Sequence, residues 1–131
     1  MKKKIFIVCS VLLLGAMLGG IIIFKGIQSN KAESFNLNDE PYYLGAMRDF
    51  PSDKILGEIP TAKDAKEKAV SEWLNLFGVK IKDEKPYKVF YDKQNDIWLV
   101  KGSLKRGWVG GVAFIIMQKS DGKILAIWHD Q

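Results

Sequence analysis

The chain has 131 residues, 47% of them hydrophobic, which suits one globular domain with an appendage and excludes wholesale disorder. Its single cysteine, Cys9, excludes an intramolecular disulfide and a cysteine metal cluster. The formal net charge of +5 does not indicate a nucleic-acid partner, because the excess lies in lysines that flank the first hydrophobic run, and residues 26–131 hold 16 basic and 15 acidic residues.

Residues 5–24 are 20 consecutive uncharged residues, and three lysines, at positions 2–4, precede them. As a helix such a run spans about 30 Å, the thickness of a hydrocarbon core. The positive-inside rule places the lysines in the cytoplasm. We therefore predict an N-terminal transmembrane helix in residues 1–25, which would make a single-pass membrane protein with its domain outside. The alternative is a signal peptide that is cleaved to release a secreted protein, for which Ala32 would end a weak cleavage site.

Residues 26–58 are predicted to be a stalk and a lead-in segment to the domain. The first part, residues 26–40, is polar. Between Pro41 and Pro60, aromatic and aliphatic side chains recur every three or four residues, which favours a short helix that packs on the domain.

The clearest element is a helix over residues 62–77. Thr61 suits the N-cap position, and Gly78 suits the end of the helix. An apolar stripe runs along one side and should face a core. It consists of Ala65, Ala69, Trp73 and Leu76.

After Pro86 the pattern changes to β-strands. Turn residues separate four apolar or alternating runs, at residues 87–91, 97–104, 109–119 and 123–129. Short connections favour antiparallel pairing, since parallel neighbours need long crossovers. We predict the α+β class for residues 59–131, with one helix packed on a curved antiparallel four-stranded sheet.

The pattern contains no nucleophile elbow, phosphate loop or dinucleotide fingerprint. Asp83 and Glu84 are adjacent carboxylates in a polar turn, a position that is normally solvated. We predict a binding protein rather than an enzyme, with no catalytic residue, cofactor or metal. An enzyme would need ionisable groups that face each other in a cavity.

Five residues are the candidates for contact with a protein partner. Exposed Trp and Arg side chains often anchor interfaces, a glycine pair marks a bend or a close backbone approach, and a terminal histidine can form hydrogen bonds. The alternatives are a Trp folded back on the sheet rim, a purely structural bend and an ordinary surface histidine. The candidates are Arg106, Trp108, Gly110, Gly111 and His129.

The order of four segments resembles that of bacterial immunity proteins with a nuclear-transport-factor-2-like (cystatin-like cone) fold, which belong to polymorphic toxin systems. The segments are PTAKDAKEKAVSEWLNLFG, EKPYKVF, IWLVKGSL and GGVAFIIMQKSDGKILAIWHDQ. The resemblance spans about residues 59–130 and implies a cone-like α+β fold. Its recurring positions are Trp98, Gly102, Gly110, Gly111, Asp121, Gly122 and His129.

The resemblance also implies neutralisation of a toxin by direct binding, and it carries no catalytic residue. Together with the hydrophobic run, it predicts an extracytoplasmic immunity protein anchored in the membrane through residues 5–24. The alternative is an extracytoplasmic regulatory or peptidase-restraining domain without a toxin partner.

Overall fold

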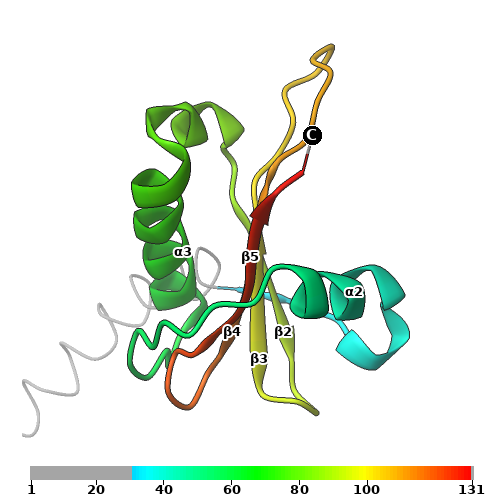
Figure 1. Cartoon of the computed structure of the whole chain (residues 1–131), viewed down its shortest axis with the longest axis vertical. Helices are drawn as coiled ribbons and strands as arrows, with labels where there is room; N and C mark the ends of the chain where they lie inside the picture. Colours follow the sequence, from blue (N-terminus) through cyan, green and yellow to red (C-terminus); the bar gives the residue numbers. More distant parts are fainter. Residues whose placement is uncertain (1–30, 131) are drawn as a thin grey trace, which may run out of the picture. The chain divides into compact units, whose positions relative to one another are not determined.

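The computed structural model describes residues 31–130, which contain one five-stranded sheet. The strands follow one another in the order β1 to β5; β1 is parallel to β2, and every other pair is antiparallel. Figure 1 shows the two α-helices on opposite sides of the sheet. The elements are β1 (Glu33–Ser34), the 3-10 helix η1 (Leu37–Asp39), α2 (Pro41–Asp49), α3 (Ala62–Phe77), the 3-10 helix η2 (Val79–Glu84), β2 (Lys88–Asp92), β3 (Ile97–Lys101), β4 (Ala113–Gln118) and β5 (Ile124–His129).

The sequence predicts a transmembrane helix followed by one helix on a four-stranded antiparallel sheet. This prediction of the fold is wrong. The sheet has a fifth strand, β1, and α2 covers its second face. Strand β1 consists of two polar residues in the segment predicted as a stalk, so no alternation marks it, and it forms only by pairing with β2. The predicted membrane run, residues 5–24, lies outside the described residues. Within residues 31–130, no helix has the length and apolar character needed to cross a membrane.

Helix α3 has the bounds that the sequence predicts, residues 62–77. The Thr61 hydroxyl accepts a hydrogen bond from the Asp64 N–H at 3.1 Å, which satisfies one of the open donors at the start of the helix. The helix ends at Gly78, whose φ of 81° suits glycine. Ala65, Ala69 and the fully buried Trp73 face the sheet at four-residue spacing. The small alanines let α3 lie close to the strands.

The sheet separates two apolar layers, because successive side chains of a strand point to opposite faces. In β3, Trp98 and Val100 join the layer under α3, whereas Ile97 and Leu99 join the layer under α2. Strand β3 is therefore buried on both faces, and so is its neighbour β4. The α3 layer also holds Ile59, Ile81, Val89, Ala113, Ile115, Met117 and Ile124, and the α2 layer holds Leu37, Ala46, Phe114, Ile116, Ala126 and Trp128.

A bulge in β5 decides which layer its side chains join. Ile124 and Ala126 pair with consecutive residues of β4, so Leu125 is an extra residue in the ladder. As a result Ile124 packs under α3, while Trp128 packs under α2. Strict alternation would have placed these two side chains on the same face.

Asp92 joins the N-terminal segment to the turn after β2. Its side chain is almost fully buried and accepts hydrogen bonds from the Leu37 N–H at 2.8 Å, the Asn95 N–H at 3.0 Å and the Asn95 side-chain amide at 2.7 Å. Burial alone would raise the pKa of Asp92, but these hydrogen bonds outweigh it and lower the pKa below its usual value.

Replacing Asp92 with alanine is expected to lower the free energy of unfolding at pH 7 by about 1–3 kcal/mol, because buried donors lose their acceptor. Since the folded-state pKa is lowered, this contribution is fully present above the unfolded-state pKa of about 3.9 and is lost as the pH falls through the folded-state value. Urea unfolding between pH 2 and 7 should therefore give a flatter stability profile for Asp92→Ala. The exposed Asp53→Ala serves as the control; an equal change there would contradict the assignment.

Candidate functional site

A long loop, residues 102–112, connects β3 to β4 and extends past the end of the sheet, close to the C-terminal end (Figure 1). Four of the five candidate residues lie in this loop. The fifth, His129, is the last residue of β5 and lies at the base of the loop, where Asp130 N–H donates to the Val112 carbonyl at 3.0 Å. The tertiary structure thus brings together Arg106, Trp108, Gly110, Gly111 and His129.

The segment that contains η2 packs against the same loop. The Ser103 N–H donates to the Glu84 carbonyl at 2.7 Å, and the Ser103 hydroxyl donates to the Pro86 carbonyl at 2.5 Å. Residues 79–88, residues 101–112 and His129 therefore form one continuous surface, which we call the loop end.

The glycine pair Gly110–Gly111 lies in the loop, before β4 begins at Ala113. The prediction of a strand that starts at residue 109 is thus wrong for its first four residues. Gly110 has a φ of 127°, a conformation that other residues rarely adopt, so a side chain at this position would strain the loop. The pair shapes the return of the loop into β4 rather than bending a strand.

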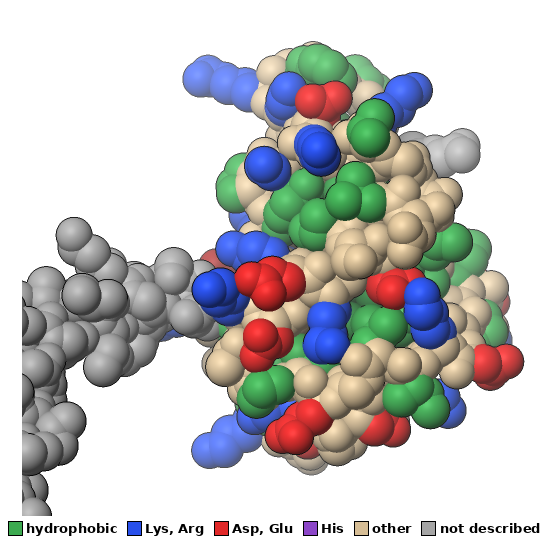
Figure 2. All heavy atoms as spheres, turned by 90° about the vertical axis from the view of Figure 1, so that its left-hand side faces the viewer, with side chains coloured by type: hydrophobic (Ala, Val, Ile, Leu, Met, Phe, Trp, Pro, Cys, Tyr) green, Lys and Arg blue, Asp and Glu red, His purple; other side chains and the backbone are tan. Residues whose placement is uncertain are grey.

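The tip of the loop exposes large apolar side chains. Trp108 is 59% exposed and Val109 is 97% exposed, so Trp108 does not fold back on the sheet rim. The ammonium group of Lys105 lies 5.2 Å from the centre of the Trp108 ring, within cation–π range. Figure 2 shows the α3 side of the domain, where hydrophobic side chains gather toward the loop end with Lys and Arg side chains around them. The exposed apolar residues of this region are Leu76, Val79, Leu104, Trp108 and Val109.

A pocket of about 400 Å³ lies between η2 and the loop. Three of the candidates, Trp108, Gly111 and His129, line it, and Lys80 stands on its η2 side. Gly110 borders a neighbouring hollow of about 360 Å³ together with Gly111. Arg106 lines neither of them and is exposed in the loop.

The Glu84 side chain connects η2 to the base of the loop, and the sequence did not predict this role. Its carboxylate contacts His129 Nε2 at 2.8 Å and accepts a hydrogen bond from the Ala113 N–H at 2.7 Å. A Cβ atom at Gly102 would lie 2.5 Å from Glu84 Oε1, so the carboxylate occupies the space beside that glycine. The prediction of a solvated acidic pair is wrong here: the Asp83 side chain is 62% exposed, but that of Glu84 is 13% exposed.

His129 has an oxygen acceptor at each ring nitrogen. Nδ1 lies 2.7 Å from the Asp130 carbonyl, and Nε2 lies 2.8 Å from Glu84. Because a carbonyl oxygen only accepts, Nδ1 must be the donor of that hydrogen bond. The contact of Nε2 with Glu84 joins the end of β5 to η2.

Replacing Glu84 with alanine is expected to destabilise the domain by about 1–3 kcal/mol, because it leaves the Ala113 N–H and the His129 ring without their acceptor. The base of the loop should loosen at the same time. Urea unfolding measures the first effect, and faster amide hydrogen exchange in residues 102–113 measures the second. Asp83→Ala is the matched control, because its carboxylate is 62% exposed and pairs with Lys105 at 3.8 Å. Equal effects of the two substitutions would contradict the role given to Glu84.

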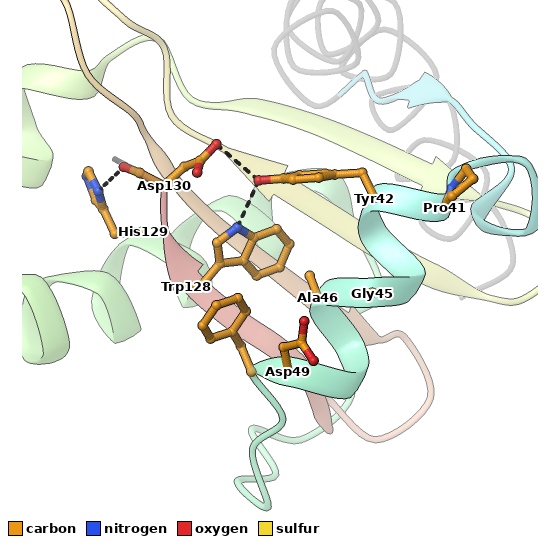
Figure 3. A pocket seen from close by; sticks show the side chains of 9 residues that line it. Pro41, Tyr42, Gly45, Ala46, Asp49, Trp128, His129 and Asp130 are labelled. Atoms are coloured by element: carbon orange, nitrogen blue, oxygen red, sulfur yellow. Dashed lines mark hydrogen bonds between the residues drawn. The ribbon is translucent and has the colours of Figure 1, made fainter.

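A second pocket, of about 360 Å³, lies on the other side of His129, between α2 and β5. Figure 3 shows that the Tyr42 hydroxyl donates to Asp130, at 3.0 Å, and accepts from Trp128 Nε1, at 3.3 Å. Burial, with Asp130 nearby, raises the pKa of Tyr42. The other carboxylate of this pocket, Asp49, pairs with Arg48 at 3.0 Å.

Among residues 31–130, no three or more His, Cys, Asp or Glu side chains are grouped so that they could hold a metal ion. The loop end offers aromatic, basic and hydrogen-bonding groups on a shaped surface.

One family model matches the chain, and its description is NTF2 fold immunity protein. The match covers residues 65–131, slightly more than half of the chain, and it includes the whole loop end. Neither a curated protein nor a solved structure matches the chain.

Proposed function

The chain belongs to the NTF2 fold immunity protein family, and from this membership we propose that it neutralises a toxin protein by binding it directly. The action is occlusion: the protein covers a surface that the toxin needs, and no covalent step takes place. Surface complementarity is then the only requirement, which agrees with the aromatic and basic character of the loop end.

The observation that carries the proposal is the exposed Trp108 beside a pocket of about 400 Å³. Trp and Arg side chains contribute most of the binding energy in many interfaces, and they do so best on a rigid support next to a concave surface. Here the loop is fastened at its base by Glu84 and His129. Trp108, with Arg106 beside it, is placed to act as the anchor.

We also propose that the domain meets its toxin outside the cytoplasmic membrane. The support comes from the sequence, in which three lysines precede the uncharged residues 5–24. Either retention in the membrane or cleavage of this segment would export the domain. N-terminal sequencing of the protein from membrane and extracellular fractions distinguishes the two outcomes, and recovery of the intact chain only from the cytosol would contradict export.

The main proposal is tested by co-expression with the product of any neighbouring gene that is toxic when it is expressed alone. Cells that produce the toxin should survive only when this protein is present, and the two proteins should co-purify. A toxin that kills equally well in the presence of the protein, or that shows no complex with it, would refute the proposed function.

A further inference from the structure

The distribution of charge on the loop end identifies the chemistry of the partner. We propose that the loop end binds an acidic protein surface that carries a protruding apolar side chain, with Lys and Arg residues around the rim and the Trp108 region at the centre. This inference rests on the proposed function and specifies the part of the toxin that the protein would cover.

The first support is that charge is unevenly distributed over the domain, although its net charge is close to zero. Residues 79–88 and 101–112 contain seven basic and two acidic residues, whereas the rest of residues 31–130 contains nine basic and 13 acidic residues. One of these 13 acidic residues, Asp130, lies beside the loop end. The basic residues of the loop end are Lys80, Lys82, Lys85, Lys88, Lys101, Lys105 and Arg106.

The second support is that most of these charges have no internal counterpart. Within residues 31–130, only Lys105 among the seven takes part in a salt bridge, with Asp83 at 3.8 Å. Lys88 and Lys101 are direct cross-strand partners in the β2–β3 ladder, and like charges in this position repel each other. An acidic partner would relieve this repulsion on binding.

The third support distinguishes a protein from the other polyanions that a basic surface attracts. An apolar centre with a charged rim is the usual anatomy of a protein–protein interface. The pocket beside Trp108 is concave, so it can take an inserted side chain, whereas a bilayer surface cannot fill it.

The test uses the full chain and the toxin encoded beside its gene. In the loop-end variant, Lys80→Glu, Lys82→Glu and Arg106→Glu are combined. In the control variant, Lys63→Glu, Lys93→Glu and Lys123→Glu are combined; these three lysines are exposed and lie outside the loop end, so the change in net charge is the same. Association rates are measured for both variants at several salt concentrations.

The loop-end variant is expected to bind at least tenfold more slowly than the wild type and to lose most of its salt dependence, while the control changes by less than about threefold. If the toxin binds the wild type and both variants alike, the inference fails and the proposed function stands. If the toxin does not bind the wild type, the proposed function fails and the inference falls with it. The inference would also be overturned if the wild type bound phosphatidylglycerol vesicles or a DNA duplex more tightly than it binds the toxin, and if that binding required these three residues.

Discussion

Replacing Trp108 with alanine is expected to weaken binding of the toxin about 30-fold or more, which corresponds to the loss of one interface anchor of about 2 kcal/mol. The stability of the protein should change little, because the side chain is 59% exposed. Surface plasmon resonance measures the affinity, and urea unfolding measures the stability. The effect should appear mainly in the dissociation rate, since a lost apolar contact does not alter long-range attraction.

The matched control is Ile55→Ala, which removes an apolar side chain of similar exposure, 62%, outside the loop end. Its affinity should equal that of the wild type. Trp108→Phe should recover part of the binding, because a phenyl ring keeps some of the apolar contact. Unchanged affinity of Trp108→Ala would remove Trp108 as the anchor, and an equal loss in Ile55→Ala would show that the binding surface is not the loop end.

Replacing Trp73 with alanine is expected to lower the free energy of unfolding by about 3–5 kcal/mol. Trp73 is fully buried between α3 and the sheet, and its indole N–H donates to the Phe114 carbonyl at 3.2 Å. The substitution leaves a large cavity and removes the hydrogen bond from the indole to the Phe114 carbonyl. Since small domains are stable by only about 5–15 kcal/mol, a substantial part of the stability should be lost.

Circular dichroism during urea unfolding measures this change without depending on tryptophan fluorescence. Leu76→Ala is the control on the same helix, because the Leu76 side chain is 58% exposed and should cost less than about 1 kcal/mol. Trp73→Phe should fall between the two, since the phenyl ring refills part of the cavity but cannot donate to Phe114. If Trp73→Ala were no less stable than Leu76→Ala, the packing of α3 on the sheet would need revision.

The candidate site was partly predictable because its members have residue types with recognisable uses. A Trp beside an Arg in a turn indicates an exposed anchor, and Trp108 is indeed exposed. Glu84 was not predictable, because an acidic residue in a polar turn looks the same whether it is solvated or buried. Only the approach of β5 and β4 to η2 gives it His129 and the Ala113 N–H as partners.

The sequence by itself determined the elements whose stabilising interactions are local. Helix α3 follows from its cap residues and its four-residue apolar spacing, and the start of β3 follows from the short apolar run after a turn, because both patterns arise within a few residues. The tertiary structure alone decided the two-residue strand β1, the bulge at Leu125 and the gathering of basic residues at the loop end. These features depend on contacts between residues far apart in the chain, and no local pattern encodes such contacts.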